Sequence, residues 1–376
     1  MDRKLWDVLQ TEVPLTERPF LEIGKTIGTS EAEVLRRVKA MKGEEGGGGG
    51  GIIRQISAIF DSRSLGYQTS LVAAKVTEEK IEEAAMIINL HPGVSHNYKR
   101  NHAFNLWYTL AVPPESKLGL EETVEILHRL SGAEATRMMP TIKVFKIGVK
   151  FDWPPEPMAP IGTVAFSPRQ TAVGGGDATQ WDTITPKNAV ASVGAKADSI
   201  AHNAPQLEDE AKKFIRILQQ DLPVVAEPFA VWAKQSGVTV ESLLEAGRDF
   251  LRRKWIRRFS AVFKHRAAGI SANAMGAWTV KPEDHETFGK TAAAFKAVSH
   301  CYLRQSYPDW PFNMFTMVHA PTTERCEEVL AAISRETGVT EYAALYSTKE
   351  YKKQRVRYFT GDVERWEQKA GRNNEI

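Results

Sequence analysis

The chain has 376 residues, of which 42% are hydrophobic and 25% are charged, and its formal net charge is +3. This composition allows two substantial hydrophobic cores, and so small a net charge does not by itself indicate nucleic-acid binding. Two cysteines, Cys301 and Cys326, exclude a disulfide framework and a cysteine-rich metal cluster, and no signal-like segment or 18-residue apolar run occurs. We therefore expect a reduced, cytoplasmic, soluble protein without a membrane partner.

The first 52 residues have the pattern of a helix-turn-helix domain. Helical periodicity covers residues 3–10 and 16–26, and SEAEVLRRVKAM (30–41) follows with a capping box formed by Ser30 and Glu33. Six glycines at 46–51 predict the flexible tip of an elongated wing, and the absence of a following G-K-[ST] argues against a phosphate loop.

From Ile52 the periodicity changes from helical to alternating. The pattern predicts, in chain order, a strand at 53–60 that extends into 67–76, helix 78–89, strands 94–100 and 104–112, helix 120–131 and strand 136–150. This order is that of a ferredoxin-like βαββαβ domain, which we place at residues 53–151.

Residues 152–206 are rich in Pro, Gly and Ala and have no sustained period, so we interpret them as a linker. A second helix-turn-helix-like domain is expected at 207–254, a second ferredoxin-like domain at 255–360 and a C-terminal tail at 361–376. The second ferredoxin-like pattern comprises strands 256–263 and 270–279, helix 282–296, strands 298–304 and 312–319, helix 322–336 and strand 341–349.

The two halves share sequence as well as pattern. VSHNYKR (94–100) returns as VSHCYLR (298–304), and IRQISAIF (53–60) returns as IRRFSAVF (256–263). LQTEVPLTERPF and FNLWYTL have counterparts in the same order, LQQDLPVVAEPF and FNMFTMV. The chain is therefore an α+β protein of two diverged copies, and we expect the copies to pair their sheets as a pseudo-dimer.

The repeated strands have a site-like composition. Because side chains alternate along a strand, Val94, His96, Tyr98 and Arg100 are predicted to share one face, as are Val298, His300, Tyr302 and Arg304. The same residues could equally form a structural His–Tyr hydrogen bond and an arginine ion pair at a sheet edge, and the repetition alone does not decide between these interpretations.

The arrangement of helix-turn-helix, wing and βαββαβ domain resembles the Lrp/AsnC family. Within that superfamily, VSHNYKR and FNLWYTL together with FKHRAAGISANAMGAW, VSHCYLR and WPFNMFTMVH resemble the siroheme decarboxylases of the alternative haem and haem d1 pathways. Those enzymes are usually two related subunits, and this chain looks like their fusion.

The resemblance implies removal of two acetate carboxylates, at C12 and C18, from siroheme to give 12,18-didecarboxysiroheme and CO2. No cofactor is expected beyond the iron that siroheme carries. His96 and His300 are the candidate proton donors, and Tyr98 and Tyr302 would orient them or relay a proton. Basic residues would bind the eight carboxylates of siroheme; the candidates are Arg100, Arg304, Arg54, Arg257, Arg63, His265 and Arg266.

Other residues have two interpretations each. His96, His265 and His300 are alternatives for an axial ligand of the substrate iron, with His102 a lesser candidate. Asn105 and Asn313 either bind a carboxylate or cap a strand end. Aromatic and methionine side chains either line a flat pocket or belong to the core; these are Trp107, Trp278, Phe312 and Met314.

An Lrp/AsnC-like transcription regulator that senses a tetrapyrrole is the alternative function, and a tetrapyrrole carrier is a third. Arg36, Arg37 and Lys39 suit phosphate contacts or a solvated helix face, and we favour the solvated face. Glu241 and Glu245 would repel DNA in the second copy, so we do not expect a nucleic-acid partner. Whether one or both copies are catalytic, and whether the chain forms a homo-oligomer, stay open from the sequence.

Overall fold

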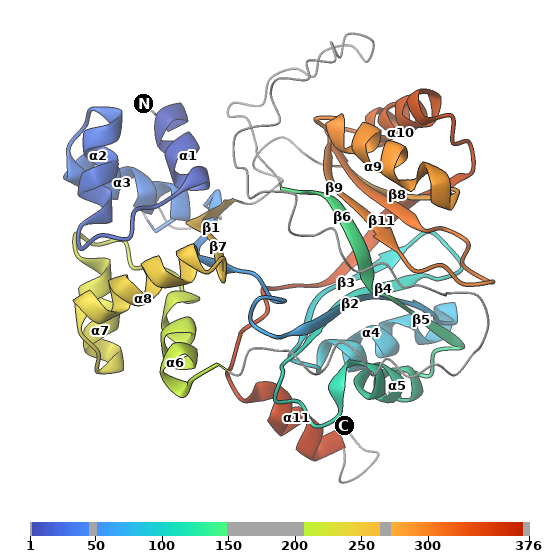
Figure 1. Cartoon of the computed structure of the whole chain (residues 1–376), viewed down its shortest axis with the longest axis horizontal. Helices are drawn as coiled ribbons and strands as arrows, with labels where there is room; N and C mark the ends of the chain where they lie inside the picture. Colours follow the sequence, from blue (N-terminus) through green and yellow to red (C-terminus); the bar gives the residue numbers. More distant parts are fainter. Residues whose placement is uncertain (1, 45–50, 149–206, 264–271, 371–376) are drawn as a thin grey trace. The chain divides into compact units, whose positions relative to one another are not determined.

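The computed structural model describes residues 2–44, 51–148, 207–263 and 272–370 (Figure 1). All of these residues belong to one compact unit. Among the helices in these ranges, none has the length and apolar character that crossing a membrane requires. The predicted linker at 152–206 lies outside the described residues.

The helix-turn-helix regions of the two copies form a single lobe with one shared hydrophobic cluster. Ser30 Oγ accepts a hydrogen bond from the Glu33 amide at 3.3 Å, and Thr239 caps its helix in the same way, which fixes where the third helix of each copy begins. The helices of this lobe are α1 (Asp2–Thr11), α2 (Pro19–Ile27), α3 (Glu31–Lys42), α6 (Asp209–Leu218), α7 (Pro228–Ser236) and α8 (Val240–Arg252).

Strands β1 (Ile53–Phe60) and β7 (Ile256–Phe263) do not belong to the ferredoxin-like domains, so that part of the prediction is wrong. They pair antiparallel with each other, Ser57 opposite Ser260, and their apolar residues join the cluster of the helical lobe. The sequence pattern identified both strands, but their partner lies in the other copy.

The glycine run was predicted as a hairpin tip. Residues 45–50 lie outside the described part, but the flanking elements are known: α3 ends at Lys42, β1 begins at Ile53 and β1 pairs with β7. The described elements on either side of the run are therefore a helix and a strand.

Each ferredoxin-like domain has the predicted βαββαβ order. The first contains β2 (Gln68–Lys75), a 3-10 turn η1 (Glu78–Lys80), α4 (Ile81–Asn89), β3 (Val94–Arg100), β4 (Leu106–Val112), α5 (Gly119–Ser131) and β5 (Ala135–Met139), followed by β6 (Thr141–Ile147). The second contains β8 (Ala272–Trp278), η4 (Pro282–Asp284), α9 (His285–Ala294), β9 (Val298–Arg304), β10 (Met314–Ala320), α10 (Thr323–Thr337) and β11 (Tyr342–Lys353).

The copies exchange the ends of their last strands, as Figure 1 shows for β6 beside β9. Residues 342–346 of β11 pair with β8 of their own copy, and residues 347–353 pair with β3 of the other. In the first copy Pro140 divides the equivalent segment into β5, which pairs with β2, and β6, which pairs with β9; proline lacks the N–H that the ladder needs.

The resulting strand order is β5-β2-β4-β3-β11-β8-β10-β9-β6. Its two end strands are consecutive in the chain, so the nine strands form an almost closed sheet. Helices cover its outer surface, α4 and α5 on the first copy and α9 and α10 on the second (Figure 1). The inner surface carries a separate cluster that includes Trp107, Met139 and Leu345. We call these two surfaces the helix side and the inner side.

The expected C-terminal tail is partly helical. Residues Asp362–Ala370 form α11, and Trp366 and Ala370 join the helix-side cluster of the first copy. The prediction of a tail over 361–376 is therefore wrong for 362–370, because a short amphipathic helix was not distinguished from an exposed end; residues 371–376 lie outside the described part.

Candidate active site

The repeated strands β3 and β9 both contain a bulge, which corrects the predicted alternation. Val94 pairs with Leu110 but His96 pairs with Thr109, so Ser95 is the extra residue of β3. Val94 consequently packs in the helix-side cluster and does not share a face with His96. In β9 the register shift falls in the same place, at Ser299.

His96, Tyr98 and Arg100 lie on the inner side. The neighbouring Asn97 points the other way, since its amide donates to the Ala85 carbonyl of α4 at 3.3 Å. Arg100 lies 6.0 Å from the ring of Trp107, a member of the inner cluster. His300, Tyr302 and Arg304 are placed likewise in β9, where Cys301 contacts the Gly289 carbonyl of α9. The predicted grouping of His, Tyr and Arg is confirmed in both copies.

The two arginines of these strands are held in the same way. Arg100 donates through Nη1 to the Leu345 carbonyl at 2.9 Å, and Arg304 donates through Nη1 to the Met139 carbonyl at 2.6 Å. In each the Nε atom is buried and has no hydrogen-bond partner among the described residues. Burial lowers the pKa of both guanidinium groups to about 10, so they stay charged at neutral pH. A buried cation with an unused donor is suited to a carboxylate.

The two tyrosines lie between histidine and arginine. The ring centroids of His96 and Tyr98 are 6.1 Å apart, and those of His300 and Tyr302 are 5.8 Å apart. Burial raises the pKa of Tyr98 to about 12, with a further contribution from Glu350. Burial also raises the pKa of Tyr302, against the opposing charges of nearby arginines. Both phenols are protonated at neutral pH and can donate hydrogen bonds.

The histidines differ in what supports them. His96 Nδ1 lies 3.0 Å from Ser95 Oγ, which contacts Thr109 Oγ1 at 2.6 Å. His300 Nδ1 lies 2.7 Å from Ser299 Oγ, which contacts His319 Nε2 at 2.7 Å. This second chain continues, because His319 Nδ1 contacts the exposed Asn273.

His319 is a titratable residue of the site that the sequence did not identify. The repeat comparison aligns it with Ala111, so the matched motifs gave no signal. In the sequence, the one feature that could have indicated a site residue here is a histidine next to the apolar residues of β10. In the structure it connects His300 through Ser299 to the protein surface.

Three further predicted arginines lie near the two strands. The Arg54 guanidinium donates to the Lys353 carbonyl of β11, and its charge acts on Tyr98. Arg63 donates to the Thr141 carbonyl of β6 at 3.3 Å, and Arg257 pairs with Asp61 through Nε at 2.8 Å; both charges act on Tyr302. His265 and Arg266 lie outside the described residues.

Both asparagines hold strand ends. Asn105 bonds to the Val76 amide at 3.0 Å and carbonyl at 2.7 Å, and Asn313 bonds to the two groups of Val280 at 3.0 and 2.8 Å. Their amide groups are therefore used by the backbone, which favours the structural interpretation.

The aromatic candidates are mostly core. Trp107 is 1% exposed and donates to the Phe104 carbonyl at 2.7 Å, so it supports the inner cluster instead of lining an open pocket. Trp278 packs against Phe288 of α9 on the helix side, Met314 is fully buried and Phe312 borders the inner cluster. His102 is at the turn after β3 and accepts the Phe104 amide at 3.1 Å.

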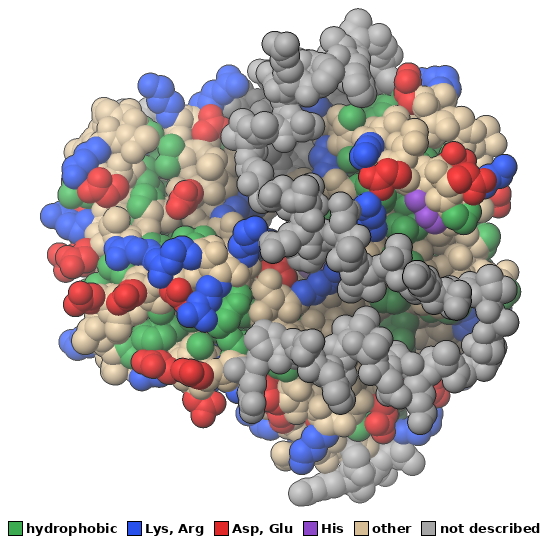
Figure 2. All heavy atoms as spheres, in the orientation of Figure 1, with side chains coloured by type: hydrophobic (Ala, Val, Ile, Leu, Met, Phe, Trp, Pro, Cys, Tyr) green, Lys and Arg blue, Asp and Glu red, His purple; other side chains and the backbone are tan. Residues whose placement is uncertain are grey.

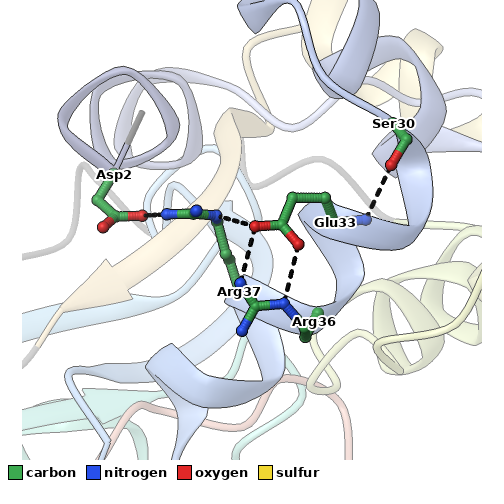
Figure 3. A network of polar contacts seen from close by, with 5 residues as sticks. All are labelled: Asp2, Ser30, Glu33, Arg36 and Arg37. Carbon is green, nitrogen blue, oxygen red and sulfur yellow. Dashed lines mark hydrogen bonds and ion pairs between the residues drawn. The ribbon is translucent and has the colours of Figure 1, made fainter.

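Two of the three basic residues of α3 that were candidates for DNA contact, Arg36 and Arg37, pair with carboxylates. On α3, Arg36 pairs with Glu33 at 2.7 Å, and Arg37 pairs with Glu33 at 2.6 Å and with Asp2 (Figure 3). Hydrogen bonds from Arg36 and Arg37 lower the pKa of Glu33 to about 2. On the face seen in Figure 2, basic and acidic side chains are interspersed over this lobe. The solvated-face interpretation of these arginines is therefore favoured.

Family models match most of the described chain. The AsnC-like ligand binding domain matches residues 64–146 and 267–352, and the siroheme decarboxylase NirDL-like HTH domain matches 2–47 and 211–257. The first pair of matches begins after β1 and β7, in agreement with the placement of those strands in the helical lobe.

Individual proteins extend this similarity over the full length. The chain is 35% identical to the siroheme decarboxylase of Hydrogenobacter thermophilus over 96% of both chains. It is 42% identical to the siroheme decarboxylase beta subunit of Methanosarcina barkeri, over 39% of this chain and 95% of that subunit. A crystal structure of the siroheme decarboxylase NirDL with an iron-uroporphyrin III analogue matches with a TM-score of 0.69 and 32% identity, over 98% of this chain and 97% of that one. The chain therefore belongs to the siroheme decarboxylase family.

Proposed function

We propose that this chain removes the C12 and C18 acetate carboxylates of siroheme, giving 12,18-didecarboxysiroheme and two molecules of CO2 for the synthesis of haem or haem d1. The observation that supports this most is the inner side of β3 and β9, where each strand presents a histidine, a protonated tyrosine and an arginine whose buried Nε has no hydrogen-bond partner among the described residues. Siroheme carries eight carboxylates, and the positive charges of the arginines at both strands complement their negative charge.

The reaction balances without an oxidant. The bond between the methylene and carboxyl carbons breaks, CO2 leaves, and the electron pair remains on the methylene carbon, where the macrocycle delocalises it. One proton then converts the methylene carbon to a methyl group. Each acetate thus releases one CO2 and takes up one proton, so the chain has to supply charge neutralisation and a proton donor.

The arginines would bind the carboxylates that do not react, and a histidine would deliver the proton. Serine contacts with Nδ1 hold the rings of His96 and His300, and we propose Nε2 as the atom that delivers the proton. The same atom could instead coordinate the iron that siroheme brings. Tyr98 and Tyr302, protonated at neutral pH, would orient a carboxylate or the reacting acetate.

The proposal is tested by incubating the purified protein with siroheme without oxygen and recording the mass of the tetrapyrrole. We expect a product lighter by two CO2, with a transient intermediate lighter by one. A folded sample that binds siroheme but leaves its mass unchanged would contradict the proposal and favour a carrier. DNA mobility shifts at low salt, which a regulator would give, provide the comparison for the alternative function.

A further inference from the structure

A small cavity lies where the chain leaves β11 and enters α11. Its volume is about 170 Å³, and its walls come from the residues just before β2 and β3, the end of β4, the segment 352–357 and the beginning of α11. The N-terminal end of a helix carries partial positive charge on its free backbone amides. The polar side chains that line the cavity include Tyr67, Lys352, Arg355, Arg357, Thr360 and Asp362.

This cavity is separate from the inner side of the sheet. Of the described residues that line it, none belongs to the inner cluster. Lys352 lies opposite Asn97, which faces the helix side, and the Lys352 ammonium donates to the Asn89 carbonyl at 2.7 Å. The volume is also below the roughly 300–1,000 Å³ of pockets that enclose drug-sized ligands. The cavity therefore suits a small ligand and not a tetrapyrrole.

The basic side chains of the cavity have no carboxylate partner within the described part of the chain. Arg355 donates through Nη1 to Ser57 Oγ at 2.9 Å, which leaves its other N–H groups unused. Lys352 donates to two backbone carbonyls and keeps one of its three N–H groups. The exposed Arg357 has no hydrogen bond or ion pair among these residues. Burial lowers the pKa of Arg355 to about 10, so its guanidinium stays charged at neutral pH.

Two carboxylates act on these arginines, and each already has a partner. Asp362, which is near Arg357, pairs with Arg365. Asp221, whose charge acts on Arg355, pairs with Lys42 at 2.9 Å. Cations that are partly removed from water are unfavourable unless an anion or water compensates them. The cavity thus has a surplus of positive charge.

Tyr67 supplies a further donor. It is 5% exposed, and its Oη accepts the Phe359 amide at 2.8 Å. The O–H of this phenol has no acceptor among the described residues, and burial raises the pKa of Tyr67, so the group is protonated at neutral pH. Buried hydroxyls are normally hydrogen-bonded to protein, water or ligand. An acceptor inside the cavity would use this O–H.

We propose that this cavity binds a small multivalent oxyanion of the size of phosphate, held by Arg355, Arg357, Lys352 and the hydroxyl of Tyr67. The site is additional to the proposed decarboxylation and does not depend on it. A phosphate group carries about two negative charges near neutral pH and has several acceptor oxygens. Arginine binds such oxygens through charge-assisted hydrogen bonds. The bound anion would tie the segment 354–361 to the first ferredoxin-like domain and so hold α11 in place.

The experiment titrates the full-length protein, purified without phosphate, with inorganic phosphate in a calorimeter, against potassium chloride at equal ionic strength. We expect saturable binding of phosphate and an increase in Tm that chloride does not give. Arg355→Gln and Arg357→Gln should each weaken binding at least about tenfold, because each removes charge-assisted hydrogen bonds. Arg335→Gln is the matched control, since Arg335 is an exposed arginine of α10 without an ion pair among the described residues, and it should bind as the parent does.

Hydrogen exchange locates the anion, because the arginines of β3 and β9 also attract phosphate. Amides of residues 354–363 should exchange more slowly with phosphate in the parent but not in Arg357→Gln. Arg357 bonds to no described residue, so Arg357→Gln should fold even if loss of the Ser57 contact destabilises Arg355→Gln.

Three outcomes would overturn the inference. The first is a folded parent without saturable phosphate binding, and the second is protection that is confined to β3 and β9. The third is parent-like binding by Arg357→Gln, or an equal loss in Arg335→Gln, since phosphate would then respond to general charge and not to this cavity.

Discussion

His96 and His300 occupy equivalent positions in their strands, but their hydrogen-bond partners differ. Behind His96, the contacts within the described part of the chain lead to the hydroxyls of Ser95 and Thr109. Behind His300 they pass through Ser299 to His319, a second titratable group. If His300 donates the proton as proposed, this chain offers a route for replacing it, since serine and imidazole both donate and accept.

We expect His319→Gln to slow decarboxylation at least about tenfold while siroheme affinity changes less than about twofold, because proton supply and not ring binding is affected. Single-turnover rates and an absorbance titration on the same protein separate these quantities. Asn273→Ala, at the exposed end of the chain, should have a smaller effect. Equal losses of rate and affinity in His319→Gln would show instead that His319 maintains the shape of the strand.

At the scale of elements, helix α11 closes the helix side of the first copy over His91. The rings of His91 and Trp366 are 4.4 Å apart, and His91 is 0% exposed. Its Nδ1 accepts the Gly93 amide at 3.0 Å. Burial, together with the charge of Lys352, lowers the pKa of His91 to about 3. The docked helix therefore keeps this imidazole neutral.

The free energy of unfolding should consequently fall in mild acid. Between pH 6.5 and 5 the unfolded chain protonates His91 and the folded chain does not, so stability is fully present above pH 6.5 and decreases by up to about 1.4 kcal/mol per pH unit below it. Denaturant titrations at several pH values measure how the free energy of unfolding depends on pH. His91→Gln should reduce this slope by the amount that corresponds to about one bound proton. An NMR titration in which the folded His91 protonates near pH 6 would contradict the expectation.

At the scale of the whole molecule, each half depends on the other for its last strand. β6 pairs with β9, the end of β11 pairs with β3, and β1 pairs with β7. The helical lobe also has one hydrophobic cluster built from both copies. Separation would expose strand edges and apolar surface at the same time.

Residues 1–148 and 207–376, produced as separate chains, should each be unstable and aggregate, whereas coexpression should yield a 1:1 complex with the parent's circular dichroism spectrum. Light scattering after size exclusion measures the stoichiometry. Relatives named as alpha and beta subunits match portions of this chain, which is consistent with such a division. Two halves that remain folded and monomeric when alone would show that the exchanged strands contribute little stability.

The sequence by itself determined the element order, the two copies, and the His, Tyr and Arg of each repeated strand, because hydrophobic periodicity and internal repetition are local or collinear signals. Tertiary structure decided the pairing of β1 with β7, the exchange of last strands and the docking of α11, since partners far apart in the chain leave no periodic trace. Tertiary structure also decided which side of the sheet each side chain faces. A bulge at Ser95 in β3, and at Ser299 in β9, turns the first valine of the strand to the helix side. Only that folded register brings Val144 and Ile147 beside Tyr302 and His300, where the matched residues of the first copy are charged.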